Sequence, residues 1–151
     1  MNQGIIYVAT GAKYLAEAIR SAASAKTFMP HLPITLFTDS PDLKPPGREM
    51  FDQIIPLDNP SHSFEDKIRP LKESPYQQTL FLDTDTLILD DCSEIFAPLR
   101  RYDMAVCYEY YRIEFDFEKT LECFPTLNTG CLLYTSPSPR DRTRSRMPSS
   151  A

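Results

Sequence analysis

Two aspartates, Asp83 and Asp85, stand two positions apart at the end of an apolar, strand-forming run within TLFLDTDTLILDD, residues 79–91. A carboxylate removed from water costs several kcal/mol unless it is paired or binds a metal. If extended backbone continues through the pair, both side chains leave the same face of the strand. Two hard oxygen ligands aimed together suit Mn²⁺ or Mg²⁺. The other interpretation is that the strand ends at Leu82 and that both aspartates lie in a solvated turn.

A divalent cation held by such a pair can also bridge a diphosphate group. There it would neutralise the charge that develops when the diphosphate acts as a leaving group. A D-x-D sequence occurs often by chance, so the pair alone does not decide between the metal site and the turn. The strands and helices that position the pair must therefore be considered to decide between the metal site and the turn.

Strand and helix patterns alternate along the chain. Short apolar, β-favouring runs predict strands over residues 4–10, 34–39, 52–57, 77–83, 87–89 and 103–109, and a last strand that opens at 125–130. Helical spacing predicts a long helix over 12–25, and shorter helices from Ser63 to an interruption near Pro70, at 92–96 and at 112–124. The alternation predicts an α/β fold with a mostly parallel sheet flanked by helices.

The predicted strands bring polar residues to one edge of the sheet. Ligands of parallel sheets bind beyond the carboxyl ends of the strands. Thr10, Asp39 and the pair Asp83 and Asp85 all fall at carboxyl ends of predicted strands. This position favours the interpretation in which the pair binds a ligand, although Asp39 could equally cap the next turn.

With these features, the chain resembles nucleotide-diphospho-sugar transferases of the GT-A fold, near the group that includes glycogenin. In that family a Tyr on the helix after the first strand stacks on uracil, and VATGAKYLAEA has Thr10 and Tyr14 at the matching positions. A Lys that reaches the diphosphate is matched by Lys67 in FEDKIRPL. The family's D-x-D motif, which holds the metal, is matched by Asp83 and Asp85.

A fourth motif extends the resemblance over nearly all of residues 4–130. The family's F-N-S/T-G element contributes to the donor-sugar pocket and resembles LNTG here, with Asn128 and Gly130. The resemblance implies a glycosyltransferase of hexosyltransferase-like type that needs Mn²⁺ or Mg²⁺ and takes a nucleotide-diphosphate sugar, a UDP-sugar, as donor. It does not identify the acceptor. It also implies retention at the anomeric carbon.

Each of these residues also has a simpler structural interpretation. Tyr14 fits a partly buried helix position, Lys67 a solvated charge, and Asn128 with Gly130 a turn. The sequence FLDTDT also fits the D-x-D-x-T motif of haloacid-dehalogenase-type phosphatases, with Asp83 as nucleophile and Asp85 as acid/base. That motif normally follows the first strand, whereas here about eighty residues of alternating strand and helix precede it. A third possibility is a non-catalytic module that binds a metal or a nucleotide.

The last 21 residues differ from everything before them. Residues 131–151, CLLYTSPSPRDRTRSRMPSSA, resemble a translated sequencing adapter. We therefore expect an incomplete GT-A domain over residues 1–130 and a non-native tail over 131–151. In the resembled family a downstream His completes the metal site, so residues 1–130 alone are expected to be inactive. CLLY is apolar enough to form a strand, to which we assign no function.

Removing the tail makes the charge more negative. Of the 16 Lys and Arg residues, four lie in the tail, and of the 21 Asp and Glu residues, one does. Residues 1–130 thus carry 12 basic and 20 acidic side chains, a formal net charge of −8. This charge disfavours nucleic acid and anionic membranes as partners.

The remaining features predict a cytoplasmic protein. No apolar run reaches membrane-spanning length, and the N-terminus lacks the basic region of a signal peptide. The four cysteines lack metal-type spacing and are predicted to be buried or partly buried thiols without disulfides. His31 and His62 match no motif of the family and are interpreted as surface residues.

Overall fold

The computed structural model describes residues 2–108 and 127–135 of the 151-residue chain. Its strands are β1 (Gln3–Ala9), β2 (Ile34–Thr38), β3 (Gln53–Pro56), β4 (Gln78–Leu82), β5 (Met104–Tyr108) and β6 (Leu127–Thr135). Its helices are α1 (Ala12–Phe28), α2 (Ile68–Lys72) and the 3₁₀ helices η1 (Gly47–Met50), η2 (Phe64–Lys67) and η3 (Ser93–Arg100). The helix expected over residues 112–124 lies outside the described residues.

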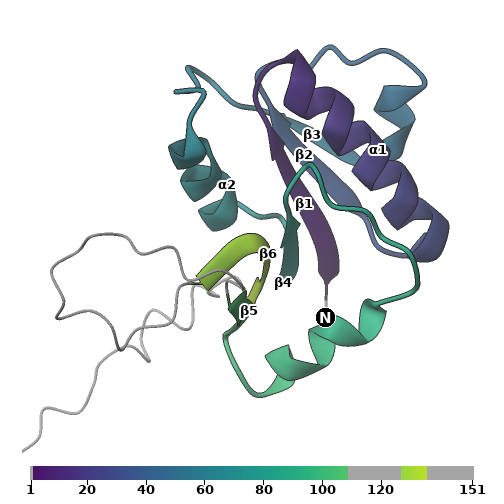
Figure 1. The fold of residues 1–151 in the computed structure, drawn as a ribbon, viewed down its shortest axis with the longest axis vertical. Coiled ribbons are helices and arrows are strands. Elements are labelled where there is room, and N and C mark those ends of the chain that lie inside the picture. The colour runs from purple at the N-terminus through teal and green to yellow at the C-terminus, as the bar shows by residue number, and fades with distance from the viewer. Residues whose placement is uncertain (1, 109–126, 136–151) are drawn as a thin grey trace, which may run out of the picture.

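The six strands form one sheet in the order β3-β2-β1-β4-β6-β5 (Figure 1). Neighbours among β3, β2, β1 and β4 are parallel, whereas β6 pairs antiparallel with both β4 and β5. The carboxyl ends of β1, β2 and β4 therefore lie at one edge of the sheet, as the sequence predicts. The mostly parallel α/β sheet confirms the expected fold class.

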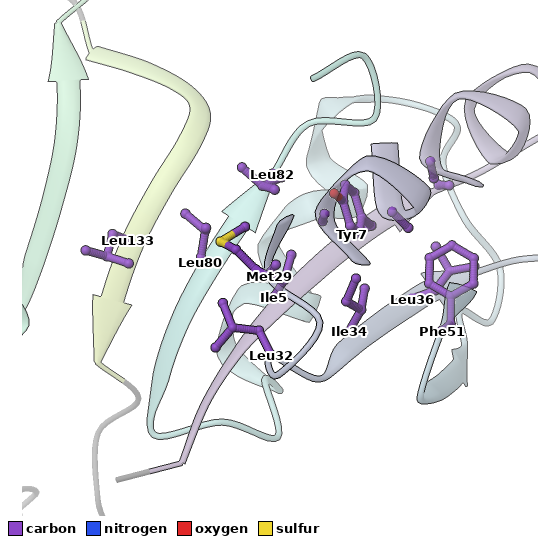
Figure 2. Close-up of a cluster of buried hydrophobic side chains, with 14 of the residues drawn as sticks. Ile5, Tyr7, Met29, Leu32, Ile34, Leu36, Phe51, Leu80, Leu82 and Leu133 are labelled. Atoms are coloured by element: carbon purple, nitrogen blue, oxygen red, sulfur yellow. The ribbon is translucent and has the colours of Figure 1, made fainter. Parts of the chain in front are cut away.

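Both faces of the sheet are covered. Successive strand residues point to opposite faces, so Ile5 and Tyr7 of β1 pack toward α1 and η3, while Ile6 and Val8 pack toward the side of Leu71 in α2. Figure 1 shows α1 and α2 on opposite sides of the central strands. Figure 2 shows the larger cluster, on the α1 side. Burial on both faces explains why the strands read as continuous apolar runs.

The helix that starts at Ser63 is divided in two. The Ser63 hydroxyl accepts a hydrogen bond from the Glu65 N–H (3.2 Å) and caps η2, and α2 follows without a break. Pro70 lies in the first turn of α2, where a missing N–H costs little. Within the described residues, no helix has both the length and the apolar character needed to span a bilayer. Cys92, Cys107 and Cys131 are free thiols. Cys92 and Cys131 are partly buried, as predicted, whereas Cys107 is exposed, and Cys123 lies outside the described residues.

One predicted strand is absent, and the last strand runs on into the apolar residues 131–134, as their composition allows. Residues 87–89 form no strand, because Leu87 and Leu89 are exposed while the Ile88 N–H donates to the Ser24 hydroxyl of α1 (3.0 Å). In contrast, β6 continues past Gly130, and Leu133 is buried in the core. The apolar character of residues 131–134 is sufficient for this pairing whatever their origin, so the division at residue 130 stays a prediction.

The ion pair of Lys26 and Asp52 gives a pH-dependent contribution to stability. The Asp52 carboxylate accepts hydrogen bonds from Lys26 Nζ (2.6 Å) and the Ile34 N–H (2.7 Å). Partial burial raises the pKa of Asp52, but these hydrogen bonds outweigh it, and the pKa is lower than in the unfolded chain. The contribution is therefore complete above about pH 4 and is lost as the pH falls through the folded-state pKa.

We expect Asp52→Asn to remove this part of the pH dependence. Urea denaturation between pH 7 and pH 3 should show a shallower loss of unfolding free energy below about pH 4 than in the wild type. Asp42→Asn, at an exposed side chain, is the control and should keep the wild-type slope. An identical slope for Asp52→Asn would contradict the assignment.

Candidate functional site

A cavity of about 400 Å³ opens at the carboxyl ends of β1 and β4. Its walls come from the β1–α1 turn and the start of α1, from residues 62–67, and from the turn after β4. Five of the seven predicted site residues line it: Thr10, Tyr14, Lys67, Asp83 and Asp85. The structure thus brings together residues from three separated segments, and their functional roles stay predictions.

The turn from β1 into α1 places Tyr14 at the cavity. Gly11 has φ +86°, which L-residues with a side chain rarely adopt. Its N–H donates to both carboxylate oxygens of Asp39 (3.2 and 3.1 Å), so Asp39 holds this turn and does not line the cavity. Tyr14, in the first turn of α1, is 48% exposed, and Lys13 Nζ lies 5.3 Å from its ring centroid. The Tyr14 ring is therefore open to a ligand rather than packed in the core.

Asp83 and Asp85 lie in a turn and not in extended backbone. Strand β4 ends at Leu82, and the Thr86 N–H donates to the Asp83 carbonyl (3.2 Å), which closes the turn. The prediction of an extended pair on one strand face is therefore wrong. The Asp83 N–H still donates to the Gly130 carbonyl of β6 (2.8 Å), and the backbone turns directly after it. The turn nevertheless borders the cavity with both residues. Asp85 is exposed and Asp83 is half-buried.

Lys67 forms an ion pair with Asp83 inside the cavity. Lys67 Nζ lies 2.5 Å from Asp83 Oδ1, and the two side chains are 24% and 28% exposed. The ammonium also lies 5.4 Å from the ring centroid of Phe64 and 5.6 Å from that of Phe81, within range of cation–π attraction. The interpretation of Lys67 as a freely solvated charge is therefore wrong.

Asn128 and Gly130 lie beside the cavity on β6 and do not line it. The Gly130 N–H donates to Asn128 Oδ1 (2.7 Å). A Cβ atom at Gly130 would lie 3.0 Å from Asp83 Oδ2 and 2.9 Å from Asn128 Oδ1. Gly130 therefore allows the Asp83 carboxylate to approach the β6 backbone closely.

Asp66 is a functional candidate that the sequence reasoning missed. Its Oδ1 accepts hydrogen bonds from the Ser61 N–H and hydroxyl (both 2.8 Å), and its Oδ2 accepts one from the Thr10 hydroxyl (3.3 Å). Slight desolvation raises the pKa of Asp66, but the hydrogen bonds from Ser61, His62 and Thr10 lower it overall. Asp66 thereby joins the β1–α1 turn to the loop before η2. Its place directly before Lys67 was the available sequence signal.

His62 is the second missed candidate. Its side chain is exposed, as predicted, but the residue lines the cavity. Its backbone has φ +54°, a conformation that is uncommon outside glycine and is often found at ligand sites. No motif surrounds His62, so only the folding of the loop reveals its position.

The carboxylates at the cavity fit a divalent cation that a phosphate group also binds. Within residues 2–108 and 127–135, no three or more His, Cys, Asp or Glu side chains are grouped so that they could hold a metal ion. Asp83 and Asp85 supply two carboxylates at the cavity. Mg²⁺ is commonly bound through one or two carboxylates, while substrate phosphates and water fill the other positions. The residues present therefore fit a cation that binds together with a diphosphate.

We expect Asp66→Ala to loosen the loop at Ser61 and His62. Loss of the carboxylate removes the acceptor of the Ser61 N–H, so amide hydrogen exchange at residues 61–62 should accelerate by about tenfold, the equivalent of one hydrogen bond. Mass-spectrometric exchange measures this directly. Glu65→Ala, at an exposed acid in the same helix, is the matched control and should leave the loop unchanged. Equal exchange in both variants would refute the role of Asp66.

Comparison with known proteins gives matches among solved structures. No protein-family model matches the chain, and neither does any curated protein. An active-site mutant of LgtC aligns with a TM-score of 0.57 at 17% identity over 87% of this chain and 57% of that chain. The galactosyltransferase LgtC in complex with donor and acceptor sugar analogues aligns with a TM-score of 0.56 at 18% identity over the same shares, 87% and 57%.

A third match has the same fold in a longer protein. The apo form of the glycosyltransferase GlyE from Streptococcus pneumoniae TIGR4 aligns with a TM-score of 0.52 at 17% identity, over 89% of this chain and 34% of that chain. The chain thus spans little more than half the length of LgtC and about a third of GlyE. At these identities the likeness concerns the fold, and the α/β architecture described above is that of these glycosyltransferases.

Proposed function

We propose that the chain forms the donor-binding part of a metal-dependent glycosyltransferase that transfers a sugar from a UDP-sugar to an acceptor. The main support is the convergence of Tyr14, Lys67, Asp83 and Asp85 on one cavity at the carboxyl edge of a sheet with a glycosyltransferase fold. An aromatic ring, an ammonium group and two carboxylates are the groups needed to bind a base, a diphosphate and a cation.

The size of the cavity supports a ligand of this class. Its volume of about 400 Å³ lies within the ordinary range for small-molecule sites. Tyr14 lines the cavity and is 48% exposed, and we propose that the uracil stacks on its ring. Thr10 and Asp66 form the wall that joins Tyr14's turn to the loop before η2. This wall would contact the nucleoside.

The diphosphate is assigned to the part of the cavity that holds Lys67, Asp83 and Asp85. These two carboxylates would hold the Mn²⁺ or Mg²⁺ ion. When bound, the cation would neutralise charge on the departing diphosphate. Lys67 adds a positive charge from the protein itself, and the aromatic rings beside it limit its solvation.

Asn128 and Gly130 are assigned to the donor sugar. The Asn128 side-chain oxygen already accepts the Gly130 N–H, so its orientation is fixed and its amide N–H groups remain as donors for a sugar hydroxyl. Gly130 contributes through its lack of a side chain, which keeps space next to Asp83.

The phosphatase alternative is not favoured. Its motif normally follows the first strand, whereas here the D-x-D-x-T sequence follows β4, and the solved structures with this fold named above are glycosyltransferases. Two measurements separate the alternatives. A transferase should be stabilised against thermal unfolding by UDP with Mn²⁺, whereas a phosphatase should hydrolyse an aryl phosphate with Mg²⁺. A structural module should do neither.

We expect Asp85→Asn to abolish Mn²⁺-dependent binding of UDP. The substitution keeps the size of the exposed side chain but removes the negative charge that the cation requires. Isothermal titration calorimetry with UDP in the presence and absence of MnCl₂ measures the effect. Asp90→Asn changes a nearby exposed acid outside the cavity and should bind as the wild type does. Unchanged affinity in Asp85→Asn would rule out the metal role.

We expect Lys67→Met to change metal and nucleotide binding in opposite directions. Because Lys67 pairs with Asp83 in the absence of ligand, its removal frees a carboxylate for Mn²⁺, so affinity for Mn²⁺ alone should rise. Affinity for UDP should fall because a positive charge near the diphosphate is lost. Mn²⁺ titration followed by electron paramagnetic resonance, together with calorimetry for UDP, tests both. In the control Lys72→Met, at an exposed lysine that does not line the cavity, both affinities should stay close to those of the wild type.

A further inference from the structure

We propose that Tyr7, Ser21 and Thr86 are positioning residues whose hydroxyl groups form a buried chain that fixes the turn carrying Asp83 and Asp85. The inference rests on the proposed function for what the turn binds, and on the structure alone for how the turn is held. None of the three residues lines the cavity. They come from β1, from α1 and from the turn itself.

The chain of hydrogen bonds is continuous. The Tyr7 hydroxyl oxygen lies 2.8 Å from Ser21 Oγ, and Ser21 Oγ lies 3.0 Å from Thr86 Oγ1. The Thr86 hydroxyl in turn donates to the backbone carbonyl of Asp83 (2.7 Å). Four polar groups are thus connected from the interior of the sheet to the first residue of the carboxylate turn.

The direction of the chain follows from its last bond. A carbonyl oxygen can only accept, so the single Thr86 hydroxyl proton is used on Asp83. Ser21 must then donate to Thr86, which uses its own proton, and Tyr7 must donate to Ser21. Each hydroxyl after Tyr7 therefore accepts one bond and donates one. Hydrogen bonds arranged in one direction polarise and strengthen one another.

Burial makes the arrangement costly to lose. Tyr7 and Ser21 are 0% and 1% exposed, and the Tyr7 ring lies among the apolar side chains of the core (Figure 2). Burial raises the pKa of Tyr7 to about 12, although the hydrogen bond with Ser21 acts against this, so the phenol keeps its proton at physiological pH. A break in the chain would leave a buried polar group without its partner.

The series of hydrogen bonds ends at the backbone of Asp83, one of the two carboxylate residues of the proposed ligand site. The Asp83 carbonyl accepts from both the hydroxyl and the N–H of Thr86, and the Asp83 N–H donates to Gly130. Both backbone polar groups of Asp83 are therefore fixed, and its carboxylate has only side-chain rotation left. A ligand site held in this way binds with little ordering of its own residues.

The test compares substitutions within this series of hydroxyl groups with a substitution in a separate buried hydroxyl pair. Thr86→Val removes the hydroxyl at nearly constant shape, and Thr86→Ser keeps it. Tyr7→Phe removes only the first donor. The control is Tyr76→Phe, because the Tyr76 hydroxyl pairs with Thr35 Oγ1 at 2.7 Å in the second core cluster, on the other face of the sheet.

Two readouts are measured on the full 151-residue chain. Amide hydrogen exchange of residues 84–86 without ligand should be about tenfold faster in Thr86→Val, and the Kd for UDP with Mn²⁺ should rise by about tenfold, as expected for one lost hydrogen bond. Thr86→Ser should restore both, and Tyr7→Phe should shift both less in the same direction. Tyr76→Phe should lower Tm without changing either readout.

The outcomes separate this inference from the proposed function. Wild-type exchange and affinity in a folded Thr86→Val variant would overturn the positioning role. Equal effects of Tyr7→Phe and Tyr76→Phe would also overturn it, since general stability would then explain them. If exchange changes as expected but no variant binds UDP, the positioning role stands and the proposed function fails. If Thr86→Val does not fold, Tyr7→Phe against Tyr76→Phe still decides.

Discussion

The half-buried carboxylate of Asp83 imposes the main constraint on this structure. It lies at the end of β4, where a charge without a partner would be unfavourable. Lys67 supplies the opposite charge, and Gly130 leaves the space in which the carboxylate fits. Thr86 fixes the backbone on the other side of the turn. Contacts from η2, from β6 and from the turn itself thus meet at Asp83.

The acids around the cavity fall into two groups with different uses. Asp66 is bonded to Ser61 and Thr10, and Glu17 accepts a hydrogen bond from the Thr84 hydroxyl (3.2 Å). These two carboxylates therefore belong to the framework of the site. Asp85 is exposed, and within the described residues the carboxylate of Asp83 forms its ion pair with Lys67. Under the proposed function, Lys67 would exchange this partner for a phosphate group of the ligand.

Much of the fold was predictable from the sequence because strand and helix periodicity are local. The pattern of residues 12–25 predicted α1, and apolar runs predicted the strands that carry Thr10 and Asp83 to one edge. Lys67 was found through a motif. The sequence left open whether the strand ends at Leu82 or continues through Asp85, since the end of a strand depends on its neighbour, here β6.

The missed features depend on contacts between distant residues. Asp66 and His62 reach the cavity because η2 and the loop before it lie against the β1–α1 turn. The apolar run at residues 87–89 has strand-like composition, but it turns toward α1, and there Ser24 takes the hydrogen bond that a neighbouring strand would otherwise supply. The composition of such a segment shows that it is apolar, but it does not show which element the segment packs against.

The reversed direction of β6 has a consequence for how such a protein can diversify. Because β5 runs with β4 and β6 runs against both, Tyr108 at the end of β5 pairs with Leu127 at the start of β6, on the same edge as the cavity. Both ends of the segment between these strands are thus held in the sheet at that edge. Under the proposed function, changes in this segment would alter the choice of acceptor while the strands that carry the proposed donor site stay the same.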